Sequence, residues 1–282
     1  MNKLMNNDEV SNSITIIDPV RSWGFPDFAE LFHYRDLIYF LIWRGIKVTY
    51  AQSVGGFAWA LVQPAIQILV FSIVFGGLLQ LDTGGIPYPL FSTVAVIPWS
   101  YMATAMTVGS NSLVANSGML GKVYFPRLIF VMNPSIGGLL PFLISIFLIV
   151  TVLLFYQQPL TRNIFLLPAV FLLMVAAPFA VALWMSSLTI RFRDFKIIMG
   201  QLMRALIYFV PVMYPSSQVS PEWRNIYIIN PFVGVIEGYR SCLLGGEIHW
   251  DSLISSASVT AVLLLFGALY FRRMERIVVD VI

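Results

Sequence analysis

Long apolar stretches with almost no charge alternate along this chain with short segments that carry Lys and Arg. A stretch of about 20 apolar residues is long enough to cross the roughly 30 Å hydrocarbon core of a bilayer as a helix. Six stretches qualify. The pattern predicts an all-α, polytopic membrane protein with spans at approximately 59–80, 88–110, 128–156, 164–190, 197–215 and 252–271.

Composition supports this fold class. Of the 282 residues 58% are hydrophobic and only 11% are charged, with a mean hydropathy of +0.81. A soluble domain carries about a quarter charged residues, so the excess apolar surface is expected to face lipid. The net charge of +3 does not favour nucleic acid as a partner, because the basic residues form short clusters between apolar runs and no basic face accompanies a known motif.

The distribution of Lys and Arg predicts the orientation in the membrane. With the N-terminus inside, three basic residues lie in external segments (Arg162, Arg224 and Arg240) and Arg204 lies within the fifth span. The other thirteen then lie in cytoplasmic segments: Lys3, Arg21, Arg35, Arg44, Lys47, Lys122, Arg127, Arg191, Arg193, Lys196, Arg272, Arg273 and Arg276. Because Lys and Arg accumulate on the cytoplasmic side, we expect both termini in the cytoplasm.

The residues before the first span divide into two parts. Residues 1–33 are polar and lack the apolar core of a cleavable signal, so we expect them to form a cytoplasmic N-terminal segment ahead of a single transmembrane domain, 34–282. Residues Tyr34 to Tyr50 place Asp36, Arg44 and Lys47 within an arc of about 80°. The pattern predicts an amphipathic helix in the membrane surface, after which Gly55 and Gly56 permit a sharp turn.

Two further features indicate irregular structure within the membrane. The apolar stretch 226–244 contains Asn230, Pro231, Glu237 and Arg240, and it is interpreted as a pair of re-entrant or interfacial helices before the last span. Pro134, the glycine pair 137–138 and Pro141 in the third span, and Pro178 in the fourth, predict kinks or broken helices, because proline removes a backbone donor and glycine weakens a helix.

The chain offers little material for catalysis. His33 and His249 fall on opposite sides of the predicted membrane, and no pair of carboxylates lies within a span. The single cysteine, Cys242, excludes an intramolecular disulfide, and no cluster of Cys and His provides a zinc site. Residues 117–123 resemble a phosphate-binding loop only superficially, because the spacing is too short and Val123 replaces the Ser or Thr that binds magnesium.

Two cytoplasmic loops combine basic and aromatic residues. They are 116–127, with Lys122, Tyr124, Phe125 and Arg127, and 191–196, with Arg191, Phe192 and Arg193. One interpretation makes them simple positive-inside anchors. The other makes them docking elements, whose aromatic side chains insert into a partner's pockets while the charges set the register.

Five motifs together resemble one family. The run "KVTYAQSVGGFAWALVQPAIQILVFSIVFG" (47–76), the loop "KVYFPRLIF" (122–130), "IRFRDF" (190–195), "NPF" (230–232) and the ending "YFRRMERIVVDVI" (270–282) look like those of polysaccharide-export ABC transporter permeases. The resemblance extends from about residue 35 to the end of the chain.

This resemblance implies a transport subunit of the bacterial inner membrane that forms a homodimer. Each protomer would bind a separately encoded ATPase, so that ATP and magnesium belong to that partner and this chain needs no cofactor. The substrate would be a lipid-linked polysaccharide, with O-antigen on undecaprenyl pyrophosphate as the first candidate. The resemblance also implies an ATPase-docking surface on the amphipathic helix and both loops (Arg44, Lys47, Lys122, Tyr124, Phe125, Arg127, Arg191, Phe192 and Arg193) and a periplasmic gate at Asn230, Pro231, Glu237 and Arg240.

A sugar polymer needs aromatic rings for its C–H faces and polar groups for its hydroxyls. Candidate pathway residues in and near the spans are therefore Gln63, Gln67, Trp99, Tyr101, Asn111, Arg204, Tyr208 and Tyr214. The alternative for Trp99 and Tyr214 is an interfacial aromatic belt, and for the others helix packing. Arg204 has three possible roles: its charge reaches the cytoplasmic surface, is paired, or meets the pyrophosphate of the carrier.

Other functions stay open at this point. The same kind of permease would serve teichoic acid, capsule or a small amphiphile. A membrane enzyme that modifies a glycan would need an acid or metal site at one membrane surface, which the sequence does not offer. A passive channel would work without an ATPase.

Overall fold

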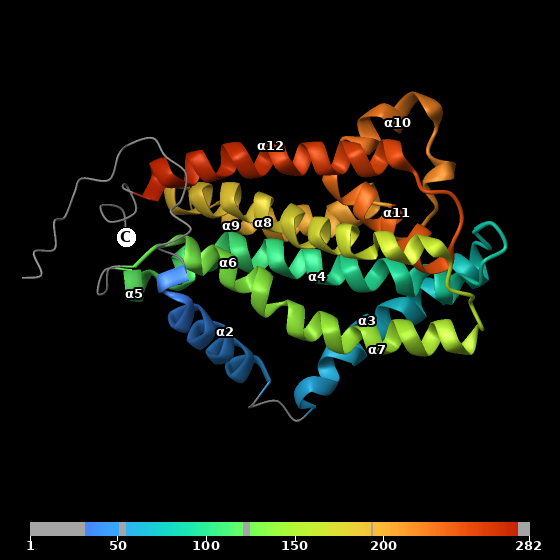
Figure 1. Cartoon of the computed structure of the whole chain (residues 1–282), viewed down its shortest axis with the longest axis horizontal. Coiled ribbons are helices and arrows are strands. Elements are labelled where there is room, and N and C mark those ends of the chain that lie inside the picture. Colours follow the sequence, from blue (N-terminus) through green and yellow to red (C-terminus); the bar gives the residue numbers. More distant parts are fainter. Residues whose placement is uncertain (1–31, 51–54, 121–124, 193, 276–282) are drawn as a thin grey trace, which may run out of the picture.

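The computed structural model describes residues 32–50, 55–120, 125–192 and 194–275, and this part of the chain contains helices and no strand. Five helical segments are long and apolar enough to cross a membrane: Gly56–Leu78, Tyr88–Ala115, Leu128–Phe155, Arg162–Arg191 and Trp250–Glu275. They run side by side along the long axis of the molecule (Figure 1). The predicted all-α polytopic fold is confirmed.

The five segments are built from named elements as follows. The first contains η1 (Gly56–Ala58), α3 (Trp59–Phe71) and the π-helical η2 (Ser72–Leu78). The second is α4 (Tyr88–Ala115), and the short α5 (Ser117–Leu120) follows it. The third contains α6 (Leu128–Gly137) and α7 (Leu139–Phe155), the fourth η3 (Arg162–Leu166) and α8 (Leu167–Arg191), and the fifth is α12 (Trp250–Glu275).

Helix α4 is the centre of the bundle. In its most apolar window 72% of the residues are buried, against 11% to 28% in the other four segments, and it packs against α3, α6, α7, α8, α9 and α11. Close packing between spans relies on small residues. A Cβ atom built on Gly109 of α4 would lie 2.8 Å from the Cβ of Ala182 on α8, and one on Gly267 of α12 would lie 2.9 Å from Nε1 of Trp184 on α8.

The break in the third span occurs where the sequence predicts it, whereas α8 continues past Pro178 without a break. α6 ends at Gly137 and α7 begins at Leu139, with Pro134 inside the last turns of α6. The turn into the first span is also as expected, since Gly56 has φ +46°, a conformation that glycine adopts without a steric penalty.

The predicted fifth span is wrong as a single helix. Residues 197–215 form α9 (Phe195–Leu206) and the 3₁₀ turn η4 (Ile207–Phe209), after which Val210 is extended. α9 begins near the end of α8. By residue 213 the backbone has reached the opposite end of α4, as shown by the hydrogen bond of 2.7 Å that Met213 O accepts from the hydroxyl of Tyr88, the first residue of α4. Helix and extended backbone together therefore run the length of the bundle.

Shorter helices occupy the two ends. α2 (Arg35–Tyr50) confirms the helix predicted over 34–50; its Leu41 is buried, and Leu37 and Ile38 pack beside it on the core that includes α6. The 3₁₀ turn η5 (Ser216–Gln218), α10 (Pro221–Ile228) and α11 (Pro231–Leu244) form the predicted helical pair before the last span. α11 is buried against α4, α8 and α12, whereas α10 lies at the edge (Figure 1).

Candidate functional site

We call the end of the bundle where α4, α8 and α12 finish and α6 begins the basic end, because Arg127, Arg191, Arg272 and Arg273 lie there. Of the docking residues predicted on α2, Arg44 and Lys47 are exposed. Arg44 Nη1 lies 3.6 Å from Sδ of Met119 on α5, so α2 and the segment after α4 adjoin. Lys47 Nζ lies over the Trp43 ring, 5.8 Å from its centroid.

The loop before α6 does not present its phenylalanine to a partner. Phe125 is only 6% exposed and packs edge-to-face on Phe130, with ring centroids 5.2 Å apart. The prediction that Phe125 inserts into a partner's pocket is therefore wrong for this conformation, because the ring belongs to the core of the basic end. Lys122 and Tyr124 lie outside the described residues.

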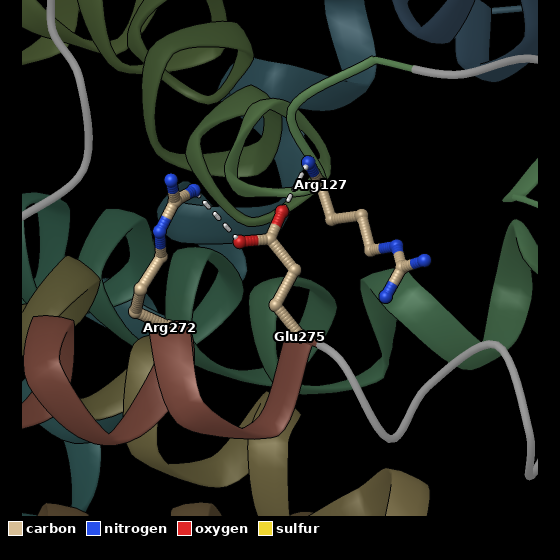
Figure 2. Close-up of polar contacts among 3 residues, drawn as sticks. All are labelled: Arg127, Arg272 and Glu275. Atoms are coloured by element: carbon tan, nitrogen blue, oxygen red, sulfur yellow. Dashed lines mark hydrogen bonds and ion pairs between the residues drawn. The ribbon is translucent and has the colours of Figure 1, made fainter. Parts of the chain in front are cut away.

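Glu275, the last residue of α12, connects that helix to this loop. One of its carboxylate oxygens accepts a hydrogen bond of 3.2 Å from the backbone N–H of Arg127, and the other lies 3.1 Å from Nη1 of Arg272 (Figure 2). Arg127 is the residue directly before α6, so a negative charge stands at the positive end of that helix. The guanidinium of Arg127 points away from this contact in Figure 2.

The second predicted loop does offer exposed groups. Phe192 is 49% exposed, and the guanidinium carbon of Arg191 lies 5.4 Å from its ring centroid. Phe195, the first residue of α9, lies beside it with ring centroids 6.1 Å apart. Arg193 lies outside the described residues. Exposed docking candidates therefore come from α2 and from the junction of α8 and α9.

Four of the predicted pathway residues meet in one cavity. It has a volume of about 390 Å³ and lies between α3, α4 and α7, with Gln63, Gln67, Trp99 and Tyr101 in its wall. The Tyr101 hydroxyl donates to Ser135 O at 2.8 Å, which fixes the ring. The sequence did not single out five further polar or aromatic lining residues, Tyr50, Ser100, Thr104, Phe142 and Ser145. A signal existed, since Gln63 and Gln67, and likewise Ser100 and Thr104, are four residues apart and share a helix face.

The remaining predicted pathway residues lie elsewhere. The Asn111 amide donates back to Thr107 O at 2.9 Å within α4. Arg204 is exposed near the end of α9, and Tyr208 is exposed in η4. The Tyr214 hydroxyl donates to Tyr208 O at 2.9 Å, so these two tyrosines belong to the irregular backbone that follows α9. The structure does not bring any of the four into the wall of the 390 Å³ cavity.

The predicted gate residues lie at the opposite end from the basic end, on α11 and its start. The Asn230 side chain accepts a hydrogen bond from Phe232 N at 3.1 Å, which caps α11 beside Pro231, and donates one to Phe209 O at 3.1 Å. Arg240 Nη2 donates to Val212 O at 3.0 Å. These contacts join α11 to the extended backbone after η4.

The acid among these gate residues is Glu237, and only 6% of its surface is exposed. α10 and α11 are outside the five apolar segments. Burial lowers the pKa of the Arg240 guanidinium to about 9, although Tyr227 and Glu237 nearby act in the other direction. Arg240 therefore stays charged at neutral pH. No group of three or more His, Cys, Asp and Glu side chains that is suited to a metal ion gathers within the ranges that the structure describes.

The sequence was compared with known families and characterised proteins. The profile of the family described as ABC-2 type transporter matches residues 36–244, which extend from the second residue of α2 to the end of α11. The chain belongs to this family.

Individual relatives of this ABC-2 type transporter agree over a larger part of the chain. It is 26% identical over 238 residues to the O-antigen export system permease protein RfbA of Myxococcus xanthus, covering 83% of this chain and 91% of that protein. It is 24% identical to RfbA of Klebsiella pneumoniae, with 85% and 92% covered, and 21% identical to the polysialic acid transport protein KpsM of Escherichia coli, with 83% and 92% covered.

Proposed function

We propose that this ABC-2 type transporter is the membrane subunit of an exporter that moves a lipid-linked polysaccharide, with O-antigen on undecaprenyl pyrophosphate as the substrate, out of the bacterial cytoplasm. A separate ATPase subunit supplies the energy. The observation that carries the proposal is the set of relatives, which align over more than four fifths of the chain and are named for O-antigen export and polysialic acid transport.

The 390 Å³ cavity supports a carbohydrate substrate. Its wall combines Trp and Tyr rings, which suit the C–H faces of sugars, with amide and hydroxyl groups that hydrogen-bond hydroxyls. Gln63 and Thr104 in this wall are exposed although both lie on apolar membrane-spanning segments. Polar groups in the membrane usually face a bundle interior or a water-filled passage rather than lipid.

A second copy of the chain would cover this surface. The apolar row Val62, Ile66, Leu69 and Ile73 on α3 and η2 is exposed next to the cavity. We propose a homodimer in which the polymer passes between the two protomers along the polar wall, with one ATPase bound to each protomer.

The basic end would face the cytoplasm, because Lys and Arg accumulate on that side. Both termini would then be cytoplasmic, and the exposed groups of α2 and of the junction between α8 and α9 would contact the ATPase. An Escherichia coli relative that is 24% identical over 218 residues is described as an inner membrane transport permease, which supports the proposed inner-membrane location.

The test is reconstitution. The permease and its candidate ATPase are purified together in lipid nanodiscs, and ATP hydrolysis is measured with lipid-linked O-antigen, with polysialic acid on its lipid, and with the carrier lipid alone. We expect the O-antigen lipid to stimulate hydrolysis several-fold over the carrier lipid. Stimulation by polysialic acid alone would shift the substrate to capsule, and failure of the two proteins to associate would overturn the proposal.

A further inference from the structure

A second polar cavity opens at the end of the bundle that lies opposite the basic end. It has a volume of about 280 Å³ and lies between α10, α11, the start of α12 and the turn at Gly245 and Gly246. Its wall includes Phe91, Arg224, Tyr227, Glu237 and Arg240. This volume is just below the range of drug-sized ligand pockets, which begins at about 300 Å³.

Two groups in this wall lack partners. Glu237 is buried, and its Oε2 atom makes no hydrogen bond within the part of the chain that the structure describes. The same holds for Nε of Arg240, although its Nη2 and Nη1 atoms donate to Val212 O at 3.0 Å and Tyr214 O at 3.4 Å. A buried polar group without a partner destabilises the fold, so buried polar groups are normally hydrogen-bonded to protein, water or a ligand.

A third group lies with them. The Tyr227 hydroxyl is buried and completes no hydrogen bond of good geometry among the described residues, although the Tyr214 side chain interacts with it. Burial raises the pKa of Tyr227, so its hydroxyl stays protonated and able both to donate and to accept. The cavity wall therefore contains an acceptor on Glu237, a donor on Arg240 and a group of both kinds on Tyr227, and a ligand would reach these buried atoms after small rotations of the side chains.

The charges of the wall decide which ligand suits these groups. An anion would be repelled by Glu237, and a metal cation would be repelled by Arg240, whose guanidinium carbon is held 3.6 Å from the centroid of the Phe91 ring. Arg224 does not change this balance, because it is paired with Asp251 at 3.1 Å. Glu247 and His249 also line the cavity, but both are exposed, so water screens their charges. A neutral ligand with several hydroxyl groups satisfies acid and base together, since each hydroxyl donates one hydrogen bond and accepts others.

We infer that this cavity binds one neutral sugar residue. Two adjacent hydroxyls of a pyranose ring would donate to Glu237 and accept from Arg240, while a third would bond to Tyr227. The inference rests on the proposed function, because it makes the cavity a holding site for a residue of the glycan where the polymer leaves the permease. It adds a site within a single protomer that is separate from the 390 Å³ cavity along α3 and α4.

The test measures sugar binding directly. The full-length chain in lipid nanodiscs is mixed with methyl glucopyranoside, methyl galactopyranoside or methyl mannopyranoside, and binding is followed by saturation-transfer NMR; glucuronate and glucosamine serve as anionic and cationic probes. We expect at least one neutral pyranoside to bind and to exceed both charged sugars. The Glu237→Gln variant should weaken its binding about tenfold, because the charged acceptor becomes a neutral amide oxygen, which makes a weaker hydrogen bond.

Two further variants guard against misfolding and nonspecific binding. Tyr227→Phe removes one hydroxyl and should also weaken binding, with the permease eluting as wild type. Glu222→Gln on α10 changes an exposed acid outside the cavity wall and should change nothing. The inference is overturned if no neutral pyranoside receives saturation, or if all three variants bind as wild type does. Because this readout needs neither ATPase nor carrier lipid, binding without glycan-stimulated hydrolysis would instead count against the proposed function alone.

Discussion

Single glycines decide how closely the helices of this permease pack, and Gly234 gives the sharpest case. Its N–H donates to Ser256 Oγ on α12 at 2.9 Å, and a Cβ atom at this position would overlap the backbone oxygen of Ser252 and lie 2.5 Å from Ser256 Oγ. Backbone cannot move aside as a flexible side chain does. We expect Gly234→Ala to destabilise the fold by about 1–3 kcal/mol, as overpacking does.

Gly200 provides the matched control. It lies inside α9, and a Cβ atom there would meet nothing within 4 Å. Gly200→Ala should leave stability unchanged or raise it slightly, because alanine is the better helix former. The measurement is the temperature at which each purified variant loses its monodisperse elution peak. Equal temperatures for the two variants would show that α11 and α12 are not packed as described.

Arg204 carries a second prediction at this scale. It is exposed about nine residues from the start of α9, roughly 14 Å along the helix, on the side that we propose as cytoplasmic. If it meets the pyrophosphate of the carrier, Arg204→Gln should lower the stimulation of ATP hydrolysis by lipid-linked glycan about tenfold, as loss of a charged hydrogen bond implies, and leave basal hydrolysis intact. Arg162→Gln, at the opposite end, is the control; equal stimulation of both variants would assign Arg204 a different role.

Residue type alone could not separate Phe125 from Phe192. Both are aromatic, and both stand in short basic segments, so the sequence favours the same docking role for each. The structure buries Phe125 on Phe130 and leaves Phe192 half exposed. The difference arises from tertiary packing between segments far apart in the chain, which a local pattern does not record.

At the scale of helices, hydrophobic length predicted the five continuous apolar segments because length and apolarity are what the bilayer selects. The same criterion failed for 197–215, where α9 ends at Leu206. Apolar residues continue past that point, but Pro211 lacks a backbone N–H, and Val210, directly before it, is extended. The position of Pro211 was thus the sequence signal for this boundary. The contacts from Tyr88 and Arg240 that hold the extended backbone could not be inferred from the sequence.

The contact of Glu275 with the start of α6 predicts a measurable effect on one helix. Glu275→Gln keeps the size of the side chain but removes the negative charge at the positive end of α6 and the ion pair with Arg272. We expect a loss of about 1 kcal/mol, the scale of a charge at a helix terminus, seen as a lower unfolding temperature. Asp36→Asn removes a negative charge from the first turn of α2, but its side chain is 97% exposed, so it should lower the temperature less, because water screens the charge. An unchanged temperature for Glu275→Gln would mean that α12 does not anchor α6.

Across the whole molecule, the two ends differ in kind. The basic end carries most of the positive charge, and the other end carries buried polar groups around a cavity. The concentration of basic residues at one end was predictable, because the positive-inside tendency can be recognised from local composition. The polar cavity at the other end was only partly predictable. Glu237 and Arg240 stand out in an apolar stretch, but their convergence with Tyr227 and Phe91 depends on how segments far apart in the chain pack together.

The last prediction concerns the exposed surface of the basic end, which we propose to contact the ATPase. Phe192 with Arg191 stacked over it is an aromatic and arginine pair of the kind that anchors interfaces. We expect Phe192→Ala to weaken co-purification of the ATPase about tenfold, while the permease inserts and elutes normally, because the ring is half exposed and supports little of the core. Phe209→Ala removes an exposed ring from η4, away from this junction, and should leave co-purification at the wild-type level. If both variants retain the ATPase equally, the partner binds elsewhere, and α2 with Arg44 and Lys47 becomes the surface to test.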